Sequence, residues 1–181
     1  MAARRHAAWL AEASALLAGS IGDEVLDELA WLAVPRLADW CYVALVRPDG
    51  SIARRPAAFA DRHDGQRLAA LHTQPVDPAS AHPVAAAIRG GQPQRHQAPD
   101  TAGRLLGLLD GGSAVVLPLQ GKAGVLGAIV FGSHRPDRYG QGDTEIIEQF
   151  ATRAGIAIER TWRPPGMPAG EAVDGGRQQR A

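Results

Sequence analysis

The stretch SAVVLPLQGKAGVLGAIVFG, residues 113–132, constrains the fold more than any other segment. Two β-prone apolar runs flank a Gly-Lys-Ala-Gly turn, which is the pattern of a β-hairpin. The runs are nearly continuous rather than alternating, so both strands are expected to be covered on both faces or to lie at the centre of a sheet. Pro118 lacks a backbone donor and is therefore expected at a bulge or at a strand edge.

Helical periodicity marks both sides of this hairpin. Apolar residues recur at steps of three and four, which predicts two opening helices and one long final helix. Gly19 is a plausible end of the first helix, Pro35 limits the second, and Asp143 is a candidate cap for the last. The apolar positions that carry the pattern are residues 10, 13, 16 and 17, then 25, 26, 29 and 32, and finally 147, 150, 151, 154 and 158.

The middle of the chain predicts a second hairpin and three shorter helices. The segment WCYVALVRPDGSIARRPAAF joins a β-prone run to a more polar one through a Pro-Asp-Gly turn. Helices are expected over residues 61–73, over HPVAAAIRGG and over residues 103–109, with an extended piece at 94–96. These elements predict an α+β fold in which helices cover an antiparallel sheet.

Composition limits the classes of partner. The chain has 181 residues, 45% of them hydrophobic, and its 19 basic and 19 acidic residues balance. This predicts one cytoplasmic domain over residues 1–162, with neither nucleic acid nor a membrane as a partner. A Pro- and Gly-rich tail over residues 163–181 is expected to be disordered. The single cysteine, Cys41, lies in a run typical of a buried strand, and no apolar run reaches the about 18 residues of a membrane span.

Chemical motifs are scarce. The sequence contains no G-x-S-x-G, P-loop or H-E-x-x-H motif. Asp110 and Ser113 flank a glycine pair but have no plausible base, so no nucleophile is assigned. Arg54 and Arg55 are interpreted as a solvated strand face in preference to a phosphate or partner patch. Four histidines are the candidates for metal or haem ligation, and solvent-exposed or capping roles are preferred for them: His63, His72, His82 and His96.

The phrases LAVPRLADWCYVALVRPDGSI, HPVAAAIRGGQP, SAVVLPLQGKAGVLGAIVFG and TEIIEQFATRAGIAIER together resemble a GAF domain. The resemblance covers residues 10–162 and is to GAF domains found beside bacterial PP2C-like phosphatases and sensor histidine kinases. It implies a six-stranded antiparallel sheet with a small-molecule pocket on one face and long helices on the other. The Asn-Lys-Phe-Asp type signature of cyclic-nucleotide members is not found, and Cys41 alone does not meet the cysteine requirements of bilin-binding or methionine sulfoxide reductase members.

This resemblance predicts a non-catalytic sensory or regulatory module in bacterial signal transduction, forming a homodimer through its terminal helices. Its cofactor is unknown, and a separate kinase, phosphatase or regulator is a possible output partner. A ligand-free dimerisation scaffold is the alternative, and a haem sensor using His82 is a remote one. The expected pocket residues are Ala58, Phe59, His82, Val84, Ile88, Leu105 and Leu117, and the expected dimer residues are Trp9, Leu16, Ile158 and Trp162.

Overall fold

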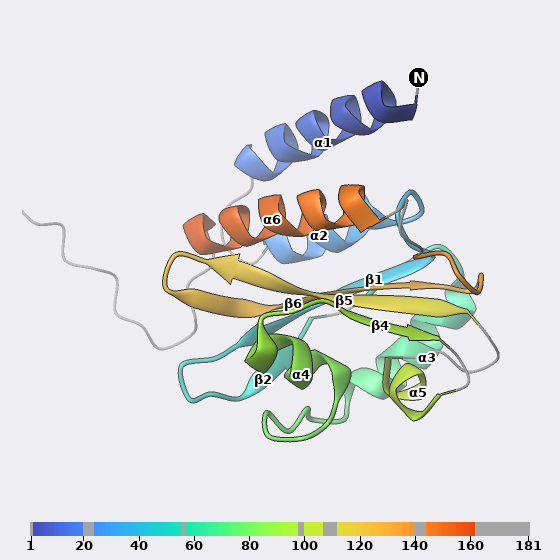
Figure 1. The fold of residues 1–181 in the computed structure, drawn as a ribbon, viewed down its shortest axis with the longest axis vertical. Coiled ribbons are helices and arrows are strands. Elements are labelled where there is room, and N and C mark those ends of the chain that lie inside the picture. The colour runs from blue at the N-terminus through green and yellow to red at the C-terminus, as the bar shows by residue number, and fades with distance from the viewer. Residues whose placement is uncertain are drawn as a thin grey trace, which may run out of the picture.

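The two predicted hairpins lie next to one another in a six-stranded antiparallel sheet (Figure 1). The computed structural model describes residues 2–19, 24–55, 57–97, 100–106, 112–139 and 144–161. The sheet runs in the order β2-β1-β6-β5-β4, and β3 also pairs with β1. The strands are β1 (Trp40–Val46), β2 (Ile52–Arg54), β3 (Ala58–Phe59), β4 (Gln94–Gln97), β5 (Ser113–Gly121) and β6 (Gly124–Ser133).

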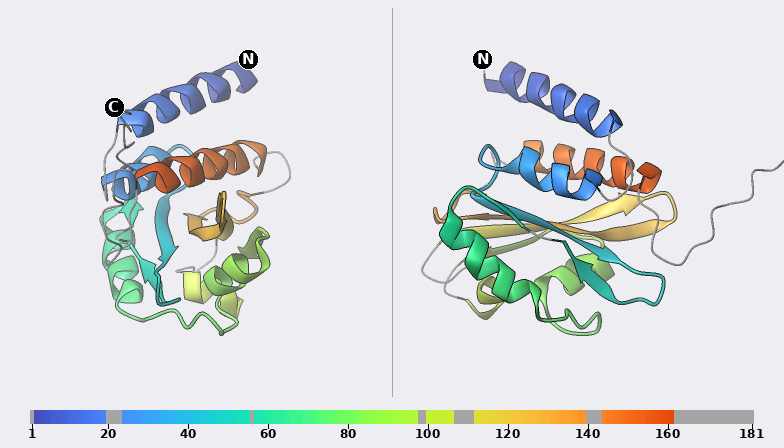
Figure 2. Two further views of the ribbon diagram at one scale, coloured as in Figure 1. Left: turned by 90° about the vertical axis from the view of Figure 1, so that its left-hand side faces the viewer. Right: turned by 180° about the vertical axis from the view of Figure 1, so that it is seen from behind.

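Helices cover both faces of this sheet (Figure 2). The upper face in Figure 1 carries α2 and α6, with α1 lying over them as an outer layer, whereas α3, α4 and α5 cover the lower face. This arrangement confirms the predicted α+β architecture. The helices are α1 (Ala2–Gly19), α2 (Glu24–Ala33), α3 (Arg62–His72), α4 (Pro83–Gly90), α5 (Thr101–Leu106) and α6 (Thr144–Thr161).

The central hairpin has the predicted properties. Strand β6 lies in the middle of the sheet, and β5 lies between β6 and the edge strand β4. Pro118 pairs with Ala128 of β6, whereas β4 begins to pair with β5 only at Val116. Its missing N–H therefore falls beyond the end of β4, and a register shift follows directly between Leu119 and Gln120. The expectation of a strand edge or bulge is confirmed.

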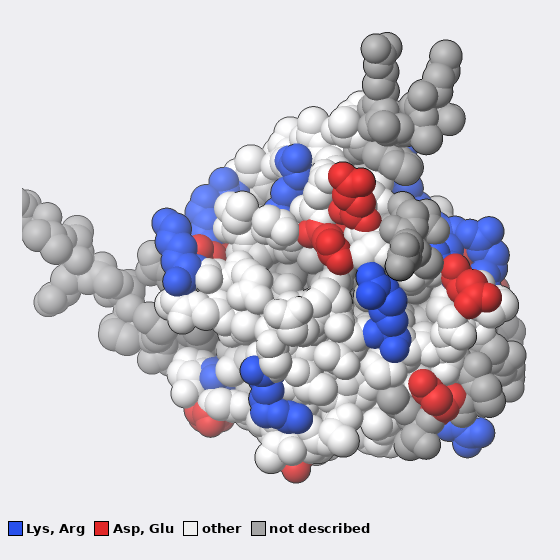
Figure 3. Space-filling view, in the orientation of Figure 1, with Lys and Arg blue, Asp and Glu red and all other residues white. Residues whose placement is uncertain are grey.

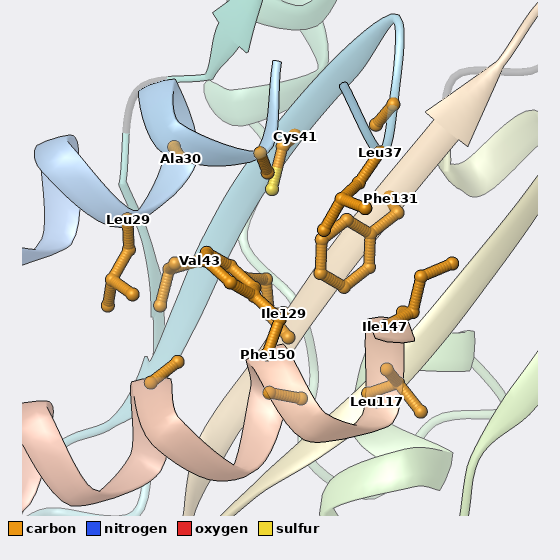
Figure 4. Close-up of a cluster of buried hydrophobic side chains, with 14 of the residues drawn as sticks. Leu29, Ala30, Leu37, Cys41, Val43, Leu117, Ile129, Phe131, Ile147 and Phe150 are labelled. Carbon is orange, nitrogen blue, oxygen red and sulfur yellow. The ribbon is translucent and has the colours of Figure 1, made fainter. Parts of the chain in front are cut away.

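Strand alternation separates two cores. In β1, Cys41, Val43 and Leu45 face the layer of α1, α2 and α6. Trp40 and Tyr42 face α3, α4 and α5. Figure 4 shows the first cluster, in which Phe131 of β6 and Phe150 of α6 meet Cys41, Val43 and Ile129.

Two arginines of α6 hold the outer helix in place. Arg153 donates from Nη1 to the Ser14 hydroxyl at 2.6 Å. One turn of α1 further on, Arg160 donates from Nη2 to the carbonyl oxygens of Leu17 and Ala18 at 2.8 and 3.1 Å. Residue numbers rise together along both helices, so α1 and α6 run in the same general direction. The last carbonyls of α1 thus find donors that the helix itself does not supply.

Some expectations fall on residues outside this description. The proposed cap Asp143, the dimer residue Trp162 and the tail over residues 163–181 all lie outside the described ranges. The expected helix over residues 103–109 is seen as α5, which starts at Thr101, and its last described residue is Leu106.

Candidate ligand-binding site

A hollow of about 360 Å³ opens between α3 and the β2–β3 segment. Strand β2 contributes Arg54, and β3 contributes Phe59. The opposite wall is one side of α3, where Gly65, Ala69 and His72 recur at helical spacing. Ala57 and Thr73 complete the lining.

Small residues create the space. A Cβ atom on Gly65 would lie only 2.5 Å from the ring of Phe59, so this ring packs directly over the glycine. Ala57 and Ala69 add only methyl groups to the wall. Its volume is within the about 300–1,000 Å³ of typical small-molecule sites.

Polar groups gather behind and beside this hollow. Burial and then the positive charge of Arg54 lower the pKa of His72 to about 4, so this imidazole is neutral at pH 7. The His72 ring meets the Tyr42 ring edge-on, with 4.6 Å between centroids. Burial raises the pKa of Tyr42 to about 12, although nearby Arg54 opposes the shift. The Tyr42 hydroxyl and His72 Nε2 are buried and, within the described ranges, meet no hydrogen-bond partner of normal geometry.

His82 has a structural role at the start of α4. Its Nδ1 accepts a hydrogen bond from the Val84 N–H at 3.2 Å, which makes it the N-cap. Burial first, and the charge of Arg54 second, lower the pKa of His82 to about 4, while a hydrogen bond to the Leu105 backbone opposes this. Both ring nitrogens are thus used in contacts within the protein, one of them in capping α4. The position of His82 gives no support to the haem alternative.

The other histidines are dispersed. His96 lies on β4, where burial lowers its pKa and Asp100, 3.8 Å away, opposes the shift. His63 is exposed at the start of α3, and its N–H donates to the carboxylate of Asp61. Within the described part of the chain, no three His, Cys, Asp or Glu side chains form a group that could hold a metal ion.

The expected pocket residues do not share one site. Phe59 lines the hollow, while Val84 and Ile88 belong to the core under α4 and Leu105 is 38% exposed. Two expectations are wrong about the face of the sheet, because Ala58 and Leu117 belong to the opposite core. Ala58 pairs directly with Cys41 and therefore shares its face.

Leu117 is misplaced for a similar reason. It pairs with Ile129 of β6, which also points toward α6, whereas Val116 points toward α4. A shift of one residue along a strand exchanges the faces. Apolar character alone does not reveal which neighbour faces the pocket.

The two adjacent arginines have different environments. Arg54 lines the hollow, and its Nη2 donates to the carbonyl oxygen of Gln74 in the segment after α3. The Arg55 guanidinium instead lies 3.7 Å from the carboxylate of Asp27 on α2. Arg54 thus lies at the solvent-exposed edge of the hollow, and its position between α3 and β2 carried no sequence signal.

The expected dimer residues also divide. Trp9 is buried and stacks on Phe150 with 5.3 Å between ring centroids, and Ile158 is fully buried in the same core. Neither is available on the surface of this chain, so both expectations are corrected. Leu16, by contrast, is 54% exposed and lines a recess of about 320 Å³ together with Glu28, Trp31 and Leu32.

Hydroxyl groups near the strand ends are engaged in structural contacts. Ser113 Oγ donates to the Arg135 carbonyl oxygen, and Ser133 Oγ donates to the carboxylate of Asp39. His134 Nε2 lies 2.8 Å from Asp64, not on the neighbouring serine hydroxyl. Asp110 lies outside the described residues. These contacts do not form a nucleophile–base–acid chain.

The charged side chains on the surface do not point to one class of partner. On the face shown in Figure 3, basic and acidic side chains are interspersed with large uncharged areas. In the residues described, no helix is both long enough and apolar enough to cross a membrane.

The fold and the hollow define an α+β domain with a candidate small-molecule site on one face of its sheet. A model of the GAF domain matches residues 21–159, and the chain belongs to the GAF domain family. GAF domains are typical of sensory and regulatory modules in signalling proteins. No curated protein matches the chain.

Solved structures agree on the fold. The GAF-B domain of DevS from Mycobacterium smegmatis is similar at 24% identity and a TM-score of 0.59, covering 76% of this chain and 92% of that domain. The nlh2 GAF domain of A. Aeolicus in an inactive state has 13% identity and a TM-score of 0.67, covering 88% and 99%. The fRMsr of Staphylococcus aureus in its reduced form has 13% identity and a TM-score of 0.66, covering 84% and 94%.

Proposed function

We propose that this GAF domain is a non-catalytic sensory module that binds a small molecule in the hollow between α3 and the β2–β3 segment. The observation that carries the proposal is the hollow itself, with Arg54, Phe59 and His72 in its walls. Beneath α4, by contrast, Val84 and Ala87 are fully buried against the sheet. The ligand site is therefore assigned beside α3 and not beneath α4.

Two observations support a role without catalysis. Cys41 is buried, and burial raises the pKa of its thiol far above the usual value, so the reactive thiolate is suppressed. Ser133 and His134 contact different carboxylates, Asp39 and Asp64 respectively. Binding accounts for the hollow without any bond-making step.

The output route is proposed to be the helical layer and a second copy of the chain. Leu16 is 54% exposed, Trp31 55% and Ile156 63%, and they lie on α1, α2 and α6 respectively. These residues replace Trp9 and Ile158 as the proposed dimer surface. The ligand would act by favouring one arrangement of these helices over another.

Native mass spectrometry after dialysis against a metabolite extract tests the ligand. We expect a bound mass on the wild-type protein that Ala69→Trp, which fills the hollow, abolishes. Ala70→Trp is the matched control, because Ala70 is exposed on the same helix but does not line the hollow. A wild-type protein that emerges empty would favour the ligand-free scaffold, and equal binding by both variants would place the ligand elsewhere.

A further inference from the structure

The charge of the hollow is one-sided. Arg54 is the charged residue among those that line it, and no Asp or Glu is part of the described lining. The nearest acid along α3, Asp64, is buried and engaged by Arg67 at 2.5 Å and by His134 at 2.8 Å. Its carboxylate is thus engaged by two residues that are not part of the described lining. The described lining of the hollow thus carries one cationic side chain and no carboxylate.

The arginine is held at the wall of the hollow. Its Nη2 donates to the Gln74 carbonyl, which ties the side chain to the segment after α3. A guanidinium carries five N–H donors in a planar fork, so it can keep its contacts within the protein and still donate to a carboxylate. Orientation by a backbone carbonyl reduces the entropy lost when an anion binds.

The remaining polar groups have limited roles. Thr73 Oγ1 already donates to the Ala70 carbonyl at 2.7 Å, so its hydroxyl proton is used within the protein. His72 is neutral at pH 7 and can donate one ring N–H, and its Nε2 is buried without a partner among the residues described. Because His72 Nε2 is buried against the protein interior, Arg54 supplies the polar end of the site.

The rest of the lining is apolar. The Phe59 ring packs over Gly65, and Ala57 and Ala69 extend the apolar wall. A volume of about 360 Å³ is larger than an inorganic ion needs and accommodates an organic body beside the charged end. The arrangement combines one cationic end with an aromatic wall.

We infer that the hollow selects a small organic anion, with its carboxylate at Arg54 and its apolar or aromatic body against Phe59. This inference rests on the proposed function and specifies the ligand class for that site. Electrostatics and hydrogen bonding favour the anion, and the aromatic wall favours an organic acid over inorganic ions.

Matched pairs of probes test the charge requirement. Benzoate and hexanoate are titrated against their neutral primary amides by isothermal calorimetry at pH 7.5, with NMR shift mapping to locate the site. We expect each acid to bind at least 10-fold more tightly than its amide, with shifts at Phe59 and along α3. Equal affinity of acid and amide, or no binding of either acid, would overturn the inference.

Two neighbouring arginines provide the variant and its control. Arg54→Gln should weaken benzoate at least 10-fold and leave benzamide unchanged, whereas Arg55→Gln should change neither, because Arg55 pairs with Asp27 away from the hollow. Equal losses in both variants would indicate a general charge effect and contradict the inference.

The extract experiment separates this inference from the proposed function. A neutral molecule that Ala69→Trp displaces would overturn the anion class and retain the hollow as a ligand site. Absence of any extract ligand together with failure of all four probes would overturn both.

Discussion

The two faces of the sheet differ in how completely they are filled. The face toward α2 and α6 buries large side chains such as Phe131 and Phe150, which meet edge-on with 6.1 Å between ring centroids. The face toward α3 and α4 buries Tyr42 beside His72 and leaves a hollow next to α3. Close packing stabilises the first face, while the second combines small residues with desolvated polar groups. The comparison places the close packing chiefly on one face and the proposed ligand site on the other.

The largest expected effect breaks the packed face. Phe150→Ala removes a fully buried ring between Trp9 and Phe131, and should lower the free energy of unfolding by about 3–5 kcal/mol. Urea denaturation measures the change. Glu148→Ala, at an exposed position on the same helix, should stay within about 0.5 kcal/mol. If Phe150→Ala lowered the free energy of unfolding by less than about 1 kcal/mol, well under the usual cost of such a cavity, the proposed difference in packing between the two faces would be contradicted.

Acidification should act on the polar face. The folded-state pKa values of His72 and His82 are lowered to about 4, so between pH 6.5 and 4 the unfolded chain binds more protons than the folded one. The contribution of these two neutral histidines to the free energy of unfolding is complete above pH 6.5 and is lost as the pH falls toward 4. With solvent screening we expect about 1 kcal/mol per histidine.

Urea unfolding at pH 7.5 and pH 5 measures this loss. His82→Asn keeps a capping side chain but removes one titrating group, so it should reduce the pH dependence. His63→Gln, at an exposed position, should retain it. A pH dependence that is the same in His82→Asn and in the wild-type protein would show that His82 does not contribute.

A substitution at the hollow sharpens the comparison on the binding side. The added methyl of Gly65→Ala would lie 2.5 Å from the Phe59 ring and force this ring to move, at a cost of about 1–2 kcal/mol in stability. Because Phe59 lies 5.9 Å from the Trp31 ring, the tryptophan emission should change as well. The effect of Gly65→Ala on the emission spectrum is measured again in a Trp31→Phe background, where any change must come from other tryptophans. If Gly65→Ala changed the spectrum equally in both backgrounds, or in neither, contact between the Trp31 and Phe59 rings would be contradicted.

The smallest effect on stability is expected at the outer recess. Trp31→Ala should cost less than about 1 kcal/mol, since the side chain is more than half exposed. It should nevertheless weaken self-association measured by sedimentation equilibrium, because aromatic residues are enriched at the centres of interfaces. Glu24→Ala, exposed at the start of the same helix, is the control. A wild-type monomer at all accessible concentrations would contradict the dimer proposal.

Much of the fold was predictable because it depends on local patterns. The Pro-Asp-Gly turn predicted the β1–β2 hairpin, and Gly50 has the positive φ of 82° that the turn requires. Likewise, the HPVAAAIRGG phrase predicted α4, which is capped by His82 and followed by Gly91 in the left-handed conformation. Turns and helix ends are encoded by neighbouring residues.

The candidate site was less predictable because it depends on register and on absent atoms. Ala58 faces the packed core only because β3 pairs it with Cys41. Gly65 makes room for the Phe59 ring and Ala69 adds only a methyl group to the wall, and small residues have no distinctive periodicity. The resemblance to GAF domains made Trp9 and Ile158 candidates for an interface because they lie on the terminal helices, but an apolar residue on a helix looks the same whether it packs within one chain or between two.

The arginine contacts between α1 and α6 have a mechanical consequence. Arg153 is hydrogen-bonded to α1 at Ser14, and Arg160 is hydrogen-bonded to it at Leu17 and Ala18. A force along α6 is therefore transmitted to the outer helix at two points. Sliding one helix past the other stretches both contacts together, whereas peeling from one end breaks them in succession. The pair should therefore resist shear better than peeling, and a twist imposed on α6 should turn α1 with it.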